Sequence, residues 1–375
     1  GHGNKQIDTP AMARLAAEGA HFEKFYVSPV CAPTRASLLT GRYHGRCGVH
    51  GVTRGRETMR AEEVTLAEVF RQAGYATGCF GKWHNGANYP FHPRGQGFDE
   101  FFGFCAGHWN NYFDADLEHN GRPVQSKGYI TDVITDRAIA YIRGHRGQPF
   151  FCYVPYNTPH SPWQVADRYF DKYKARGLDD KTACAYAMCE NLDENLGRLL
   201  TTLDDLDLAR NTIVIFLSDN GPNSNRYNGG MKGRKGSVHQ GGIRVPCFIR
   251  FPGLIPAGRK IDHFEAAHID LLPTLVELTG IEEPRTLPLD GRSLAPALVG
   301  DRGVWPDRLL FTTWRGRGAV RDGQYVSTHE GQLYNLLTDP NQKQNLATRL
   351  PRVQAKLQVA YGRWQQEVSR RGFDP

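Results

Sequence analysis

The chain has 375 residues, of which 40% are hydrophobic and 23% charged, a composition that suits one large globular α/β domain and a smaller second one. No apolar run approaches the length needed to cross a bilayer, so no membrane span is expected. The net charge of +7 fits either an anionic substrate or a solvated basic surface. Without a dense Lys/Arg tract or a zinc-finger or helix-turn-helix pattern, nucleic-acid binding is not expected.

The cysteines and the first residues say little about the compartment. The eight cysteines have no CxxC motif and no regular spacing, so neither a zinc ribbon nor a disulfide framework is expected. The opening sequence Gly-His-Gly-Asn contains neither an initiator Met nor a signal peptide, and it reads like the middle of a loop. We therefore expect that the true start of the protein lies upstream of Gly1.

Helical and extended patterns alternate over the first 280 residues or so. Thr9 and Pro10 open a helix that Gly19 ends. Further helices are predicted over 65–72, 129–143, 180–203 and 269–279, and strands over 75–80, 150–155, 212–217 and 247–251. The stretch 85–127, rich in Gly, Asn, His and aromatic residues, predicts a long loop region that shapes a pocket. This alternation predicts an α/β fold, with a mostly parallel central sheet flanked by helices.

The pattern changes after residue 300. Short strands are predicted over 309–313, 318–320, 324–327 and 333–335, followed by a closing helix over 351–368. We predict two domains: a larger α/β domain over 1–303 and a small antiparallel α+β domain over 304–375.

The segment around Cys31 combines a nucleophile, a cation and a helix end. Pro33 suits the first turn of a helix and Gly41 is a natural stop, which places Cys31 at the helix N-terminus, where free N–H groups and the dipole favour an anion. Arg35, four residues on, can point along the same face. Taken alone, these residues would be better explained as a buried cysteine before a helix and a surface arginine.

The motif Cys-x-Pro-x-Arg at 31–35, with Leu-Thr-Gly-Arg at 39–42, resembles the maturation motif of formylglycine-dependent sulfatases of the alkaline phosphatase superfamily. In that family the cysteine is oxidised to an aldehyde and hydrated. One hydroxyl attacks sulfur, and deprotonation of the other expels sulfate. The resemblance implies that Cys31 is the formylglycine precursor and that Arg35 stabilises it. It also implies an alkaline phosphatase-like fold, a maturation enzyme as partner, an anionic sulfated small molecule or glycan as substrate, and a periplasmic or secreted location.

Residues 81–86 read Gly-Lys-Trp-His-Asn-Gly and resemble the family's Gly-Lys-Trp-His-Leu-Gly. Lys82 and His84 are two residues apart at the end of a predicted strand, so both side chains can face the same side. Ligands gather at such strand ends in α/β folds, although a Lys-x-His pair alone is more often a surface feature. The resemblance implies that Lys82 binds a sulfate oxygen and that His84 contacts the hydrated aldehyde and helps its collapse.

The sequence Asn-Thr-Pro-His-Ser-Pro at 157–162 follows the predicted strand 150–155 and resembles the family's Pro-His-x-Pro loop. The resemblance places His160 near the leaving oxygen as hydrogen-bond donor or general acid. A histidine between prolines can equally have a structural role.

Asp219 and Asn220 follow the strand 212–217 and offer the oxygen ligands that suit Ca²⁺, with Mg²⁺ as the alternative. A plain Asx turn before Gly-Pro would look the same. The resemblance makes this pair half of a metal site, the other half being an Asp-Asp pair at the end of a first strand. We expect that strand, with its two metal ligands, to lie upstream of Gly1.

Residues 232–246 resemble the family's Lys-Gly-x-x-x-Glu-Gly-Gly-x-Arg-x-Pro stretch. The resemblance makes Lys235 the catalytic lysine that bridges sulfate and the leaving oxygen, with Lys232 as the competing candidate. Gln240 stands where the family has Glu, and the sequence gives this exchange no role. Without the continuation to Pro246, a flexible Gly/Lys-rich loop would be the preferred interpretation.

The sequence thus predicts a sulfatase. We expect its substrate to be a carbohydrate sulfate, because the chain is basic and its loops are rich in aromatic residues. Two alternatives remain open: a phosphomonoester, phosphonate or phosphodiester hydrolase of the same superfamily, and an inactive protein that binds a sulfated glycan. Four residues of the loop region are candidates for sugar contacts or for loop packing, namely His108, Trp109, Asn110 and His119.

Overall fold

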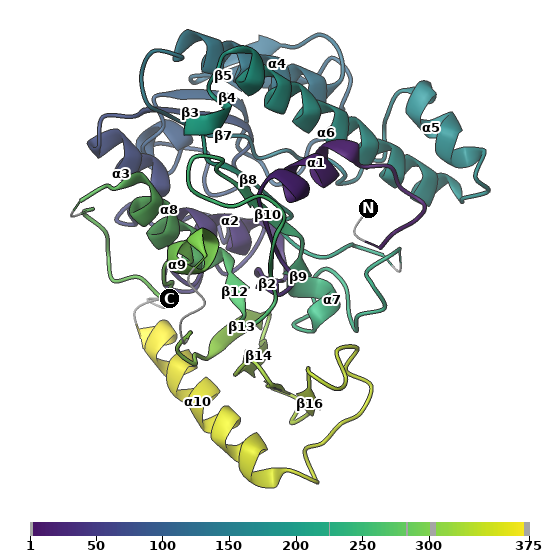
Figure 1. Cartoon of the computed structure of the whole chain (residues 1–375), viewed down its shortest axis with the longest axis vertical. Helices are drawn as coiled ribbons and strands as arrows, with labels where there is room; N and C mark the ends of the chain where they lie inside the picture. The colour runs from purple at the N-terminus through teal and green to yellow at the C-terminus, as the bar shows by residue number, and fades with distance from the viewer. Residues whose placement is uncertain (1–2, 225, 283, 301–304, 371–375) are drawn as a thin grey trace.

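The computed structural model describes residues 3–224, 226–282, 284–300 and 305–370. Within these ranges three sheets lie in the larger part of the molecule with helices on both sides, and a fourth sheet lies with the last helix at the green-to-yellow end of Figure 1. None of the helices in this part of the chain is long and apolar enough to cross a membrane.

The three sheets of the larger part contain short strands. One sheet has the order β11-β1-β10-β8, with β1 at Ala20–Phe22, β8 at Val214–Leu217, β10 at Cys247–Arg250 and β11 at Arg259–Ile261. A small sheet joins β12 (Ala266–Ala267), β2 (Phe25–Tyr26) and β9 (Arg244–Val245). The largest has the order β6-β5-β4-β3-β7, with β3 at Ala76–Lys82, β4 at Glu100–Phe104, β5 at Asp116–His119, β6 at Arg122–Gln125 and β7 at Phe150–Tyr153.

Strand directions in these sheets are mixed. β3 runs parallel to β4 and β7, and β1 runs parallel to β11. β10 runs antiparallel to both β1 and β8, and β5 runs antiparallel to both β4 and β6. The predicted α/β class with a small antiparallel sheet at its C-terminal end is confirmed, while the central sheets are more mixed than the prediction of a mostly parallel sheet.

The prediction of a long loop region over 85–127 is wrong for residues 100–104, 116–119 and 122–125, which form β4, β5 and β6. Asn120 and Gly121 join β5 to β6 with φ angles of 53° and 85°. Two successive positive φ angles are typical of the type I′ turn that closes a two-residue hairpin, and Asn-Gly is its preferred sequence. Because β5 and β6 carry mostly polar side chains, the hydrophobic alternation that would have revealed them is weak.

Helices cover both faces of the sheets. One layer contains α1 (Pro10–Glu18), α4 (Ile130–Gly144), α5 (Asp167–Lys174) and α6 (Asp180–Asp205). The other contains α2 (Cys31–Thr40), α3 (Leu66–Gln72), α8 (Leu271–Thr279) and α9 (Ala295–Val299). The short helix α7 (Gln240–Ile243) precedes β9, and single 3₁₀ turns lie at η1 (Pro93–Gly95), η2 (Ala209–Asn211) and η3 (His268–Asp270). The helices predicted over the first 280 residues therefore match within a few residues.

Alternating side chains of the strands enter different cores. On β3, Cys79 packs with the α2, α3 and α8 layer, whereas Phe80 packs with α4. On β10, Cys247 joins the first of these cores and Phe248 meets Leu15 of α1. This two-residue period, apolar on both faces, is what a sheet covered on both sides requires.

The C-terminal part is built as predicted. β13 (Leu310–Trp314), β14 (Arg317–Arg321), β15 (Tyr325–Thr328) and β16 (Leu333–Asn335) pair antiparallel in sequence order, and α10 (Pro351–Arg370) packs on β14 and β15. The Trp364 ring stacks on Phe311 at 4.7 Å and meets the edge of Tyr43, just after α2, at 5.1 Å. The predicted domain boundary between 303 and 304 lies outside the described residues.

Candidate active site

Cys31 is the first residue of α2 and its exposed fraction is 5%. Val30 before it is extended and offers no side-chain cap, so the first N–H groups of the helix have no side-chain acceptor. Pro33 lies in the first turn, and Gly41, with φ of 68°, ends the helix as predicted. A group at position 31 therefore meets the positive end of the helix dipole.

The Arg35 guanidinium is buried and lies one turn further along α2. It donates to the carbonyls of Lys82 (2.7 Å) and Tyr156 (3.4 Å), and through Nη2 and Nε to Oδ2 of Asp219 (3.1 and 3.3 Å). Burial acts to lower the pKa of Arg35, but neighbouring acidic groups, Asp219 and Cys31 among them, raise it above its usual value. Arg35 is thus a permanent cation fixed between α2 and the ends of β3, β7 and β8.

Asp219 follows β8 and is held by its main chain as well as its side chain. Thr34 of α2 donates its hydroxyl to the Asp219 carbonyl at 2.7 Å. Burial acts to raise the pKa of the Asp219 carboxyl, but the charges of Arg35, Lys82 and Lys235 outweigh it and lower the pKa. Asp219 is therefore a carboxylate near neutral pH, surrounded by three cations.

Lys82 is the last residue of β3 and its exposed fraction is 2%. Burial, together with the charge of Arg35, lowers the pKa of its ammonium group to about 8, although the interaction with Cys31 acts to raise it. An ammonium that is costly to keep charged in the free enzyme gains strongly from an anion beside it, which suits a sulfate ligand.

His84 takes the left-handed backbone conformation, with φ of 68°, directly after β3. Its Nε2 donates to the Val52 carbonyl at 2.9 Å, because a carbonyl can only accept. Among the described residues its buried Nδ1 has no hydrogen-bond partner. Burial lowers the pKa of His84 well below its usual value, so the neutral ring offers the Nδ1 lone pair as an acceptor.

His160 lies in the loop after β7, as predicted. Its Nδ1 donates to the Ser161 carbonyl at 2.7 Å, and the Tyr112 hydroxyl is within hydrogen-bond distance of the carbonyls of His160 (2.9 Å) and Ser161 (3.1 Å). Burial, with the nearby charges of Lys235 and Lys82, lowers the pKa of His160 to about 4. The free enzyme therefore holds a neutral His160 whose Nε2 is an acceptor, and this nitrogen becomes a donor only after it takes up a proton.

The two candidate lysines of the 232–246 segment point to different places. The Lys235 backbone N–H donates to the Pro222 carbonyl at 2.8 Å and so fixes this loop. The Lys235 side chain lowers the pKa values of Asp219, Lys82 and His160. Lys232 instead donates to the Tyr334 hydroxyl at 2.7 Å and lies over the same ring. The structure brings Lys235, and not Lys232, to the candidate site.

Gln240 joins the two parts of the chain. Its side-chain nitrogen donates to the Pro340 carbonyl at 2.7 Å, and its backbone N–H donates to the Gln342 side chain at 3.0 Å. The Tyr26 hydroxyl donates to the Gln240 side-chain oxygen at 3.3 Å. A neutral amide both donates and accepts, which a carboxylate cannot do, and this accounts for Gln at this position.

Asn220 and Asp219 are the residues of this site that can hold a metal. The Asn220 side-chain nitrogen donates to the Gly221 carbonyl at 3.0 Å, and its buried Oδ1 has no hydrogen-bond partner within the described ranges. An orphaned buried oxygen beside a carboxylate is the donor set that a hard cation prefers. The pair fits part of a Ca²⁺ or Mg²⁺ coordination shell.

A cavity of about 1770 Å³ lies beside these residues, between the facing edges of β7 and β8. The stretches 148–160 and 211–223 line it, and α6 contributes apolar side chains. Both strands are only partly buried, in contrast to β10, whose residues are all buried. Arg35, Lys82 and Lys235 line the same cavity, so its polar part carries a concentration of positive charge.

Several positioning residues were not predicted. The Thr34 hydroxyl fixes the main chain of Asp219, and Tyr112 fixes the His160 loop. Asn85, where the family has Leu, donates to the carbonyls of Ala32 and Glu57 at 3.2 Å each and so ties down the start of α2. Thr34 and Asn85 lie inside the motifs at 31–35 and 81–86, and this position in the sequence is what could have indicated their roles. Tyr112, distant in sequence, gave none.

Three of the four candidates for sugar contact in the loop region, all but Asn110, separate into two groups. The His108 ring lies 5.4 Å from that of His160 and so borders the site. Trp109 stacks on Phe104 at 4.8 Å, and His119 pairs with Glu100 at 3.3 Å on β5. The second group is used in packing.

Comparison with known proteins identifies the family. Residues 2–281 match the sulfatase family, and residues 234–362 match the family described as N-sulphoglucosamine sulphohydrolase, C-terminal. The chain is 34% identical to N-acetylgalactosamine-6-sulfatase of Canis lupus familiaris, over 86% of this chain and 67% of that protein. It is also 34% identical to arylsulfatase A of Bos taurus, over 86% of this chain and 70% of that protein.

A solved structure supports the same assignment. The crystal structure of Ps i-CgsB in complex with k-i-k-neocarrahexaose is similar with a TM-score of 0.88 and 28% identity, covering 96% of this chain and 88% of that chain. The chain therefore belongs to the sulfatase family, and it is a sulfuric ester hydrolase.

The first prediction concerns the support of His84. A Cβ atom at Gly107 would lie 2.0 Å from His84 Nε2, so Gly107→Ala must displace the ring and break its bond to Val52. We expect turnover of an aryl sulfate to fall by about 10²-fold, the typical effect of displacing a reacting group by an ångström. Gly144→Ala, where the added Cβ meets no atom within 4 Å, is the control. Equal activity of the two variants would contradict the conclusion that the bond of His84 to Val52 holds the ring in its active position.

Proposed function

We propose that this sulfatase hydrolyses a carbohydrate sulfate ester, with residue 31 as the nucleophile after oxidation of Cys31 to formylglycine. The observation that carries the proposal is the convergence of Arg35, Lys82 and Lys235 on one cavity beside the N-terminus of α2. A carbohydrate substrate is supported by the relative named N-acetylgalactosamine-6-sulfatase and by the structure of Ps i-CgsB with a neocarrahexaose.

Attack on a sulfate ester brings an anionic oxygen to an already anionic group. Three fixed cations in a partly dry site offset this repulsion without reorganising during the reaction. When residue 31 carries the hydrated aldehyde, it supplies the attacking hydroxyl. The helix end at residue 31 and the electrostatic interaction of Arg35 with that residue support stabilisation of an oxyanion there.

Proton transfers fall to the two histidines and to Lys235. The buried Nδ1 of His84, which has no hydrogen-bond partner among the described residues, supports a role for His84 as acceptor of the proton on the second hydroxyl of residue 31, whose removal expels sulfate. His160 is neutral in the free enzyme, and a bound sulfate, being an anion, raises its pKa and thereby favours a proton on Nε2. In this proposal Lys235, which lines the cavity, is the proton donor to the leaving oxygen.

A divalent cation, Ca²⁺ or Mg²⁺, would be held here by Asp219 and Asn220. When bound it supplies Lewis-acid stabilisation of charge on the sulfate. Two donors are fewer than the six to eight oxygens that Ca²⁺ takes. The facing edges of β7 and β8 offer the pairing that one further strand needs, and we infer that carboxylates at the end of such a strand complete the shell.

The nucleophile is tested by Cys31→Ala. We expect this variant to lose essentially all turnover of an aryl sulfate while it still binds inorganic sulfate, because the cations remain. Turnover is measured with protein produced alongside a formylglycine-generating enzyme and supplied with Ca²⁺, with Cys189→Ala as the thiol control. A matched aryl phosphate measures the competing phosphohydrolase activity. Retained sulfatase turnover in Cys31→Ala would refute the nucleophile assignment.

A second pair of variants separates the two lysines. Lys235→Ala removes a cation from the cavity and is expected to lower turnover by about 10²–10³-fold, the usual cost of one charge-stabilising donor. Lys232→Ala removes a side chain that bonds to Tyr334 outside the site, so its turnover should stay near that of the wild type. A larger loss in Lys232→Ala than in Lys235→Ala would reverse the assignment.

The pKa of Lys82 sets the expected pH dependence. Because that pKa is about 8, Lys82 is charged below pH 8 and loses its charge above it, which weakens its attraction for sulfate. We expect kcat/KM, which reports groups of the free enzyme, to fall as pH rises through about 8. Lys82→Arg keeps its charge over this range, so its lower activity should lack that fall. An unchanged alkaline limb in Lys82→Arg would exclude Lys82 as its source.

A further inference from the structure

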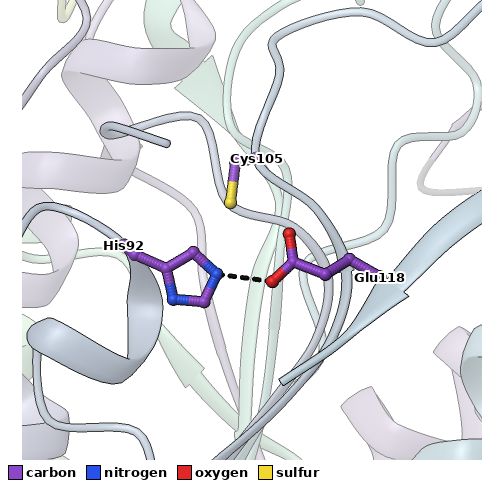
Figure 2. Close-up of side chains that lie close together, drawn as sticks. All are labelled: His92, Cys105 and Glu118. Carbon is purple, nitrogen blue, oxygen red and sulfur yellow. Dashed lines mark hydrogen bonds and ion pairs between the residues drawn. The ribbon is translucent and has the colours of Figure 1, made fainter. Parts of the chain in front are cut away.

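A second cluster of ligand-type side chains lies outside the active site. His92, Cys105 and Glu118 point toward one another (Figure 2), and their ligand atoms all lie within 4.8 Å of each other. His92 precedes η1, Cys105 follows β4, and Glu118 belongs to β5. In the described part of the chain, this is the one group of three or more His, Cys, Asp or Glu residues with such spacing.

We propose that His92, Cys105 and Glu118 bind a divalent transition metal, with Zn²⁺ as the best-fitting ion, and that this metal clamps the loop following Lys82 and His84. A nitrogen, a thiolate sulfur and a carboxylate oxygen form a ligand set that Zn²⁺ accepts in tetrahedral geometry. Ca²⁺ and Mg²⁺ prefer oxygens alone and are not matched by this set. Three protein ligands leave the fourth position to water.

The surroundings of the cluster already orient its ligands. The Gly121 N–H donates to Glu118 Oε1 at 2.8 Å, which leaves Oε2 for coordination. The His92 ring meets the edge of Phe101 at 5.1 Å and is largely buried, with 12% of its side chain exposed. Fixed, partly desolvated ligands reduce the entropy that metal binding costs.

Coordination must displace two existing hydrogen bonds. His92 Nε2 now donates to Glu118 Oε1 at 2.6 Å, and His92 Nδ1 accepts from the Arg94 N–H at a long 3.2 Å. When Nε2 binds a metal, the ring proton moves to Nδ1 and the contact with Arg94 opens. Without metal, His92 and Glu118 are hydrogen-bonded to each other, so their polar atoms have partners in the metal-free protein as well as in the metal-bound protein.

Metal binding changes the Cys105 thiol. Forming the sulfur–metal bond breaks the Cys105 S–H bond and releases one proton to solvent for each metal bound.

The cluster is coupled to the active site through the main chain. The Cys105 carbonyl accepts from the His84 N–H at 3.1 Å, and the Phe104 carbonyl accepts from Trp83 N–H at 3.0 Å. A metal that joins Cys105 to His92 would hold both ends of the loop that leaves His84. His92, Cys105 and Glu118 are therefore positioning residues, because none of them lines the catalytic cavity.

Cobalt titration of the reduced protein tests the proposal, because a thiolate bound to Co²⁺ gives a charge-transfer band in the near ultraviolet. We expect one equivalent of Co²⁺ to produce the band and Zn²⁺ to remove it by displacement. Cys105→Ser should abolish the band. Cys31→Ser, the matched control, should keep it, since Cys31 is the other thiol near a candidate metal site.

Glu118→Gln is a second variant that tests the site if Cys105→Ser fails to fold. It keeps the thiol but loses a ligand, so it should show the band at higher Co²⁺ concentrations, with far-ultraviolet circular dichroism confirming the fold. The absence of a band in the wild type, or a band of full strength in Cys105→Ser, would overturn the proposal. A band lost in Cys31→Ser would assign the metal to the catalytic cavity and equally overturn it. None of these readouts depends on sulfatase turnover.

Discussion

The candidate active site depends on the buried Arg35 guanidinium. Its bonds to the carbonyls of Lys82 and Tyr156 and to the carboxylate of Asp219 join α2 to the ends of β3, β7 and β8. A buried cation must be paired and hydrogen-bonded or its desolvation is not offset, so these contacts are as much a condition for folding as for catalysis. The residues that surround residue 31 are brought together by this one group.

The same group explains the electrostatics of the site. Arg35, Lys82 and Lys235 outnumber the single carboxylate Asp219, which keeps Asp219 ionised and makes the charge on Lys82 costly. The positive charges of this site repel one another until an anion binds between them. Binding of sulfate therefore relieves repulsion that is already present in the free enzyme, and it does so where the helix N-terminus adds further attraction.

Local patterns in the sequence predicted the parts of this site that lie within one element or directly after it. Pro33 and Gly41 predicted the limits of α2. The apolar runs before Lys82 and Asp219 predicted two strands, and so predicted that both residues lie at strand ends. The hairpin of β5 and β6 was missed because its strands are polar, although its Asn-Gly turn was visible. Contacts made by main-chain carbonyls, such as that of Val52 with His84, have no side-chain signature at all. The choice between Lys235 and Lys232 also needed the structure, because it depends on Tyr334 from the C-terminal sheet.

The central claim is that residue 31 is an aldehyde in the working enzyme. Peptide mass spectrometry of active protein, with a carbonyl-reactive hydrazide as trapping reagent, measures this directly. We predict that the tryptic peptide containing residue 31 carries the hydrazone, and that activity across preparations scales with the fraction of this peptide that carries it. A fully active preparation in which that peptide carries an unmodified thiol would contradict the account.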